Sequence, residues 1–279
     1  MTAVTCAELL ADAQSRLVAS DSARLDAELL LAQVLGLSRA QLYTRGQQAV
    51  SPADASRYAA LIERRAGGEP VAYLLGEQGF WSLSLQVDAA VLVPRPETEL
   101  LVAWALECLA DRAAPRIADL GTGSGAIALA LACERADADV VATDLSTAAL
   151  AVARGNAQAL DLTRVRFLQG HWFEPLRGTR YDLVVSNPPY IAHQDPHLHA
   201  LRHEPLSALS DGGDGLTCLR EIVAAAPDYL APGAYLLVEH GYDQGETVPA
   251  LFAAAGFVDV EMRRDLNGQP RASGGCWRG

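Results

Sequence analysis

Lysine is absent from this sequence, in which all 22 basic side chains belong to arginine. Its absence excludes two kinds of site: a P-loop in which lysine binds nucleotide phosphates, and an active site built on a lysine Schiff base. Cysteine is scarce as well, with five residues spread along the chain and no C-x-x-C pair. That spacing favours reduced, mostly buried thiols over a disulfide framework or a thiolate metal site.

Long apolar runs are also missing. No stretch of about eighteen apolar residues is free of charged side chains, so we expect no membrane span. The first residues, MTAVTCAELLADAQSRL, contain acids and lack a basic segment followed by an apolar one. We therefore expect no signal peptide and a cytoplasmic location.

Basic residues are outnumbered by acidic ones, 22 against 34, which gives a formal net charge of −12. Nucleic-acid binders are usually basic, because phosphate contacts set most of their affinity. We therefore expect no DNA or RNA partner. The balance suits a small ligand, or a protein partner that is locally basic.

Short-range patterns divide the chain into three parts. Up to residue 67, apolar residues recur at helical spacing. Gly36 is predicted to end one helix, and Ser51-Pro52 to begin another that reaches about Arg65. Residues 77–93 alternate between apolar and polar side chains, which predicts a β-hairpin. We expect a small helical domain over residues 1–70, a hairpin linker over 71–95 and a main domain over 96–279.

The main domain shows apolar runs that alternate with helical stretches, which indicates a parallel sheet with helical crossovers. The runs are RIADL, DVVATD, RVRFLQ, YDLVVS and AYLLVEH. Two last segments, GFVDVEMRRD and PRASGGCW, are predicted to form an antiparallel hairpin on the sheet edge. The expected fold class is α/β, Rossmann-like, with a mostly parallel sheet of seven strands.

A glycine-rich loop follows the first strand of that sheet, in IADLGTGSGAIALALA. Glycines let the backbone turn sharply and approach a ligand, which would lie over the N-terminus of the next helix. The second strand ends in Asp144, whose carboxylate can accept both hydroxyls of a ribose. We therefore predict a nucleoside cofactor bound by Gly121, Thr122, Gly123, Ser124, Gly125 and Asp144.

The same loop also satisfies the dinucleotide fingerprint, so the glycines alone leave the cofactor open. Asp119 precedes the loop by two residues. A carboxylate there disfavours an anionic pyrophosphate. It suits S-adenosylmethionine, which carries a sulfonium and an ammonium.

The fourth strand, YDLVVS, is followed by Asn187, Pro188, Pro189 and Tyr190. The carboxyl ends of parallel strands face the ligand crevice, so Asn187 is predicted to share a crevice with the glycine loop. The Asn187 side-chain carbonyl and the Pro188 carbonyl are two acceptors stiffened by the prolines. Two fixed acceptors suit a planar target with an –NH2 group that is to be methylated, and Tyr190 can pack against it.

With these residues the chain resembles the release-factor glutamine N5-methyltransferases, a branch of the class I S-adenosylmethionine-dependent methyltransferases. NPPY alone is shared with enzymes acting on DNA adenine. More specific is RRAGGEPVAYLLGEQGFWSLSLQVDAAVLVPRPETELLV, Arg64 to Val102, in which PRPETE is typical of the release-factor branch. DLGTGSGAIALALA, SNPPYI, QDPH, EPLSAL and LLVEHGYDQGE extend the likeness over nearly the whole chain.

The resemblance implies a class I methyltransferase domain behind a helical, substrate-facing domain. It implies methyl transfer from S-adenosylmethionine to the glutamine of the Gly-Gly-Gln motif in class I peptide chain release factors. Carried over by position, cofactor contacts would also include Trp172 and Asn187. Asn187, Pro188, Pro189 and Tyr190 would hold the target glutamine. One departure is His171, which stands where the family usually has an acid near the adenine amino group.

The residues leave other functions open. A ribosomal-protein glutamine methyltransferase shares most motifs but usually differs at PRPETE, and an adenine N6-methyltransferase of DNA or RNA fits the acidic chain poorly. Two further hypotheses are a nicotinamide oxidoreductase and a non-catalytic binding module. Each of them has to account for the NPPY turn. The group His193, His197, His199 and His203 has spacing that could bind metal. Methyl transfer from a sulfonium needs none, so we expect a lid there and no metal site.

Overall fold

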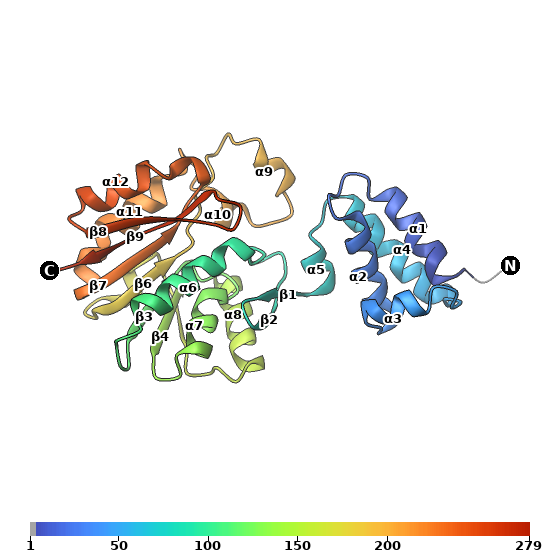
Figure 1. The fold of residues 1–279 in the computed structure, drawn as a ribbon, viewed down its shortest axis with the longest axis horizontal. Helices are drawn as coiled ribbons and strands as arrows, with labels where there is room; N and C mark the ends of the chain where they lie inside the picture. Colours follow the sequence, from blue (N-terminus) through green and yellow to red (C-terminus); the bar gives the residue numbers. More distant parts are fainter. Residues whose placement is uncertain (1–3) are drawn as a thin grey trace. The chain divides into compact units, whose positions relative to one another are not determined.

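The computed structural model describes residues 4–279, which form two compact units with the boundary between Gly76 and Glu77. The first three residues of the expected helical domain lie outside the described part. Each unit has its own hydrophobic core. Figure 1 labels the elements along the chain.

The first unit is helical, as its apolar spacing predicts. Its helices are α1 (Cys6–Arg16), α2 (Ala23–Leu35), α3 (Arg39–Thr44), α4 (Pro52–Ala66) and α5 (Val71–Leu75). Gly36 ends α2 with φ of 62°, a left-handed conformation that glycine adopts without steric cost. The Ser51 hydroxyl caps α4, with Pro52 at the first helical position. Helix α5 occupies residues 71–75, which the sequence had assigned to the hairpin segment.

The second unit opens with the predicted hairpin, made of β1 (Glu77–Phe80) and β2 (Leu83–Gln86). The hairpin is shorter than the alternating pattern predicted. Val91 and Val93 are buried but lie beyond the paired strands. The chain then enters the short 3-10 helix η1 (Pro96–Thr98) and helix α6 (Glu99–Cys108).

A seven-stranded sheet forms the centre of this unit, in the order β5-β4-β3-β6-β7-β9-β8. Its parallel strands are β3 (Arg116–Leu120), β4 (Asp139–Asp144), β5 (Arg166–Gln169), β6 (Tyr181–Ser186) and β7 (Leu230–Glu239). β8 (Val258–Arg264) and β9 (Pro270–Trp277) add an antiparallel hairpin, with β9 between β7 and β8. This confirms the α/β fold class, including the hairpin at the sheet edge.

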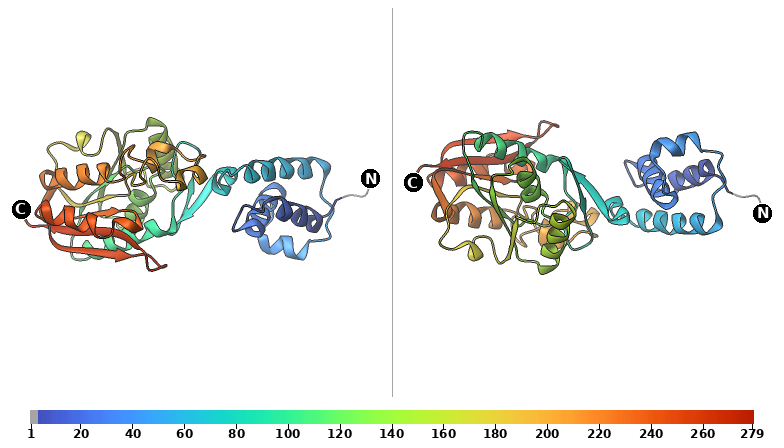
Figure 2. Two further views of the ribbon diagram at one scale, coloured as in Figure 1. Left: turned by 90° about the horizontal axis from the view of Figure 1, so that it is seen from above. Right: turned by 90° about the horizontal axis from the view of Figure 1, so that it is seen from below.

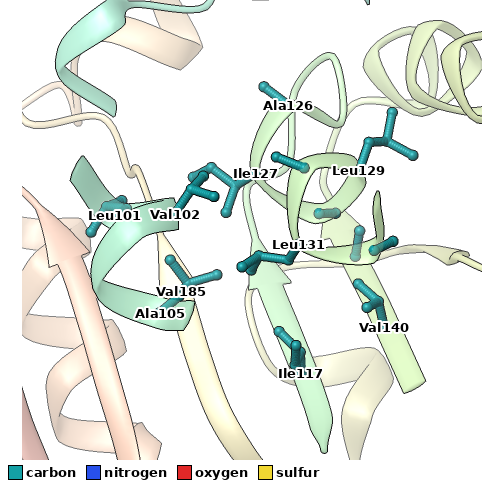
Figure 3. Packing of buried hydrophobic residues seen from close by; sticks show 14 of the residues in the cluster. Leu101, Val102, Ala105, Ile117, Ala126, Ile127, Leu129, Leu131, Val140 and Val185 are labelled. Atoms are coloured by element: carbon teal, nitrogen blue, oxygen red, sulfur yellow. The ribbon is translucent and has the colours of Figure 1, made fainter. Parts of the chain in front are cut away.

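Helices cover both faces of the sheet, because successive strand residues point to opposite sides (Figure 2). Helices α6, α7 (Ala126–Glu134) and α8 (Thr147–Ala159) pack on one face, against Ile117 and Val185. Figure 3 shows part of this core. Helices α11 (Thr217–Ala225) and α12 (Thr247–Ala254) cover the other face. The remaining short elements are η2 (Glu174–Leu176), α9 (His197–Ala200), α10 (Leu206–Leu209), η3 (Ala226–Tyr229) and η4 (Tyr242–Gln244).

The five cysteines are free thiols, as expected. Only Cys6 and Cys276 are buried, while Cys133 is exposed, so the prediction of mostly buried thiols was wrong. Within residues 4–279, the helices are all too short or too polar to cross a membrane.

Candidate active site

A cavity of about 480 Å³ lies in the second unit, where the parallel strands end. Its wall includes the glycine loop after β3, Asp144 at the end of β4 and Asn187 after β6. Three strands of one parallel sheet thus deliver their following residues to a single crevice, as the topology of such sheets requires. Its volume falls in the range of small-ligand sites.

The glycine loop is held against the neighbouring strand. The N–H groups of Gly121 and Thr122 both donate to the Thr143 carbonyl, each at 2.9 Å. Gly123 has φ of 56°, and a Cβ placed on it would meet no atom within 4 Å, so its backbone borders open space. Helix α7 begins directly after the loop. The loop therefore offers a close approach to a ligand at a helix N-terminus.

Asp144 is oriented by backbone N–H groups. Its Oδ2 accepts from Gly123 N at 2.9 Å, and its Oδ1 accepts from Ser146 N at 2.8 Å. Each carboxylate oxygen keeps a further lone pair, since a carboxylate can accept about four hydrogen bonds. Asp144 lines the cavity, so both oxygens are available to a pair of ligand hydroxyls.

Trp172 and His171 border the cavity next to the glycine loop. The Trp172 ring lies against Gly121, where an added Cβ would come within 3.1 Å of the ring. Its Nε1 donates to Glu221 Oε2 at 3.1 Å, and its φ of 45° is unusual for a non-glycine residue. The same Glu221 oxygen lies 3.6 Å from His171 Nε2. The expected stacking of adenine on Trp172 and the contact by His171 stay predictions.

Asp119 lies outside the cavity wall, although its charge was the feature that favoured S-adenosylmethionine over a dinucleotide. It is buried and does not line the cavity. Its Oδ2 accepts from Thr122 Oγ1 at 2.6 Å and from Ala128 N at 3.2 Å. Its Oδ1 has no hydrogen-bond partner within residues 4–279. Burial raises the pKa of Asp119 to about 7, and the hydrogen bonds oppose that rise. Asp119 therefore lies behind the loop, and its raised pKa weakens its negative charge near neutral pH.

The turn after β6 contributes Asn187 and Pro189 to the cavity wall. Pro188 and Tyr190 do not line the cavity. The Tyr190 hydroxyl donates to Glu239 Oε1 at 3.0 Å, and its ring packs against the core on the α11 and α12 face. The contacts expected between Tyr190 or Pro188 and a substrate therefore stay predictions.

Two residues at this site were not singled out from the sequence, Thr98 and Glu239. Asn187 Nδ2 donates to Thr98 Oγ1 at 3.1 Å, and Thr98 Oγ1 donates to Glu239 Oε2 at 2.7 Å. Both belong to motifs that had served only to mark a family, PRPETE and LLVEHG. The signal that the sequence offered was only that both are polar residues within these two motifs.

The PRPETE segment is also tied to the chain that follows the NPPY turn. The Glu204 carboxylate accepts from Val93 N at 3.0 Å and from Arg95 Nη2 at 2.5 Å. Glu204 is buried but the Arg95 side chain is 35% exposed, so this ion pair is only partly shielded from water. Residues 90–98 and 205–211, which both contribute to the cavity wall, are thereby held together.

The histidine-rich stretch after the turn surrounds α9. His197 Nδ1 lies 2.7 Å from Asp195 Oδ1. In the part of the chain that the structure describes, His, Cys, Asp and Glu side chains form no group of three that could hold a metal ion. The proposed role of His193, His197, His199 and His203 as a lid stays a prediction.

Comparisons with known proteins agree with this architecture. The family model described as PrmC N-terminal domain matches residues 8–76, and the one described as methyltransferase small domain matches residues 98–218. A solved 16S rRNA N2 G1207 methyltransferase from Thermus thermophilus shares the fold, with a TM-score of 0.53 and 19% identity. That likeness covers 72% of this chain and 50% of the other.

Full-length relatives are much closer. A release factor glutamine methyltransferase from Xylella fastidiosa is 52% identical over 254 residues, which cover 90% of this chain and 92% of the relative. One from Escherichia coli K12 is 44% identical over 266 residues, which cover 95% and 96%. The expected resemblance is confirmed. This chain belongs to the release factor glutamine methyltransferase family.

Proposed function

We propose that this protein transfers a methyl group from S-adenosylmethionine to the side-chain amide nitrogen, N5, of the glutamine in the Gly-Gly-Gln motif of class I peptide chain release factors. The observation that carries the proposal is the placement of Asn187, whose amide shares one cavity wall with the glycine loop and Asp144. Family membership supports the choice of substrate, because relatives carry that name.

The residues at the cavity fit S-adenosylmethionine, which would supply an electrophilic methyl group when bound. Gly123 leaves room for close approach, and Asp144 presents two oriented oxygens to the ribose hydroxyls. The Trp172 ring offers a flat apolar surface for adenine. Gly121, Thr122, Ser124 and Gly125 complete the loop that would border the ligand.

Asn187 would act on the target amide. An amide nitrogen is a weak nucleophile, because its lone pair is delocalised into the carbonyl. If Asn187 Oδ1 and the Pro188 carbonyl each accept one N–H, the nitrogen is aimed and the positive charge that develops on it is stabilised. No strong base is required, since the proton can leave after transfer. Pro189 stiffens the turn, and Tyr190 would pack beside the planar target.

The release factor itself is the partner that the proposal requires. A glycine-flanked glutamine can enter a narrow crevice, because glycines add no side chains to the approach. The helical unit would provide extra docking surface for the rest of the protein substrate. The acidic net charge does not favour a nucleic acid as the main substrate.

The test offers four substrates in parallel with a labelled methyl donor: a release factor, its Gln→Ala variant in the Gly-Gly-Gln motif, a ribosomal protein and adenine-containing DNA. Mass spectrometry then locates the label. We expect label on the glutamine of the release factor alone. Label that survives the Gln→Ala change, or label only on ribosomal protein or DNA, contradicts the proposal.

The enzyme variant Asn187→Ala tests the site in the same assay. We expect kcat to fall about 10²–10³-fold, the usual effect of losing one positioned transition-state contact. Affinity for the methyl donor, measured by calorimetry, should change less. Full turnover by this variant would show that Asn187 is not the acceptor.

A further inference from the structure

The amide of Asn187 is part of a chain of hydrogen bonds that runs into the protein interior. It connects three segments far apart in sequence: the turn after β6, the end of η1 and the end of β7. Asn187 Nδ2 meets Thr98 Oγ1 at 3.1 Å, and Thr98 Oγ1 meets Glu239 Oε2 at 2.7 Å. Thr98 is 4% exposed and Glu239 is 1% exposed, so solvent does not compete for these bonds.

The direction of each bond follows from the contacts of Glu239. Burial raises the pKa of Glu239, and the hydrogen bonds that its two oxygens accept from Thr98 Oγ1 and the Tyr190 hydroxyl oppose that rise. With both oxygens accepting, the single proton of the Thr98 hydroxyl is directed to Glu239. The hydroxyl then has only lone pairs left for Asn187. The Asn187 group that faces it must be the NH2, because the carbonyl cannot donate. This places the Asn187 carbonyl oxygen on the other side of the amide, away from Thr98.

We propose that Thr98 and Glu239 are positioning residues that set the orientation of the Asn187 amide, so that its oxygen serves as the acceptor in the cavity. The inference rests on the proposed function, in which Asn187 Oδ1 accepts from the substrate amide. With the amide turned over, Asn187 would present its NH2 to the substrate NH2. Two donors would then face each other and the target would be repelled.

Glu239 also holds the other end of the NPPY turn. Its Oε1 accepts from the Tyr190 hydroxyl at 3.0 Å, while its Oε2 accepts from Thr98. Burial raises the pKa of the Tyr190 hydroxyl, which therefore keeps its proton and remains a donor. One buried carboxylate thus binds both hydroxyls that fix this turn. Such a fully paired network sets a single arrangement of its members.

The activity test compares variants at Thr98. Thr98→Val keeps the shape of the side chain and removes the hydroxyl, and Thr98→Ser restores it. We expect kcat to fall about 10–100-fold in Thr98→Val, as for a misplaced reacting group, and to recover in Thr98→Ser. The dissociation constant of the methyl donor should not change. A kcat for Thr98→Val equal to that of wild type would overturn the inference.

Two further variants separate positioning from simple destabilisation. Glu239→Gln replaces one acceptor by a donor at equal size, so the Thr98 hydroxyl is free to turn towards Asn187, and we expect a loss in kcat. Ser273→Ala is the matched control. Ser273 is fully buried on β9 and bonds to His240 at 2.8 Å, but it does not contact Asn187. We expect its kcat to stay at the wild-type value. Equal losses in both variants would contradict a specific role for Glu239.

A measurement without turnover distinguishes this inference from the proposed function. The chain has three asparagines, Asn156, Asn187 and Asn267, so ¹⁵N-asparagine labelling gives three side-chain NH2 groups by NMR. We expect Thr98→Val to shift the Asn187 NH2 signals and speed their exchange with solvent, and to leave Asn156 unchanged. If the signals respond but wild type methylates no glutamine, the proposed function fails and the orientation stands. Unchanged Asn187 signals overturn the orientation itself.

Discussion

The buried carboxyl of Asp119 predicts an unusual pH dependence of stability. Only 1% of the residue is exposed, and Oδ1 has no hydrogen-bond partner within residues 4–279. Burial raises the pKa of Asp119 from its ordinary value of 3.8 to about 7. Hydrogen bonds from Thr122 and Ala128 to the other oxygen limit that rise.

The sign of the effect follows from proton binding. Between about pH 4 and pH 7 the folded protein keeps a proton on Asp119 that the unfolded chain has released. The free energy of unfolding therefore falls as pH rises through this interval, and it levels off above pH 7. Proton linkage with these two pKa values gives a loss of about 2–3 kcal/mol between pH 5 and pH 8.

Asp119→Asn isolates this contribution, because the amide stays neutral at every pH. All four tryptophans lie in the second unit, so their fluorescence in urea reports the unfolding of that unit alone. We expect the unfolding free energy of Asp119→Asn, minus that of wild type, to increase by about 2–3 kcal/mol from pH 5 to pH 8. Other titrating groups cancel in this difference. Asp111→Asn, at an exposed position, controls for the loss of one acidic residue. A difference that does not vary with pH would refute the reasoning.

Three further predictions concern the cofactor site and the helical unit. Asp144→Ala should weaken S-adenosylmethionine binding by about 2 kcal/mol in calorimetry, and wild type should not bind NAD; binding of NAD instead would contradict the site. Gly125→Ala should destabilise the second unit by about 1–3 kcal/mol in urea, because φ is +86° and the new Cβ would lie 3.0 Å from Leu129; unchanged stability would mean that the loop adapts. A chain of residues 77–279 should stay folded and bind the methyl donor, while its rate on intact release factor drops sharply; a normal rate would assign the helical unit another role.

The sequence by itself determined the local structure. Gly36 ended α2, and Ser51-Pro52 began α4, because caps and turns depend on neighbouring residues in the chain. The sequence likewise predicted the buried strands, the glycine loop and the crossovers, since periodicity and turn chemistry are short-range signals. The position of Asn187 after a central parallel strand was enough to bring it to the cavity of the glycine loop, because strand ends in such sheets share one edge.

The lengths of the elements and the pairing of the strands were harder to predict from the sequence. The pairing of the first hairpin stopped at Gln86, although the apolar alternation continued to Val93. Alternation of apolar and polar side chains indicates that one side of a segment is buried. A segment can be buried in this way without a neighbouring strand to pair with. Residues 71–75 formed α5, a helix of about one turn that is too short for periodicity to detect.

Tertiary structure alone decided how the site is assembled. Thr98 and Glu239 meet although 141 residues separate them, and no local pattern predicts which buried polar groups will pair. The sheet order placed β7 next to β6, which brought Glu239 to both Tyr190 and the Thr98 hydroxyl that holds Asn187. Packing also placed Asp119 behind the glycine loop. Its charge is set there by burial, which its position two residues before the loop does not reveal.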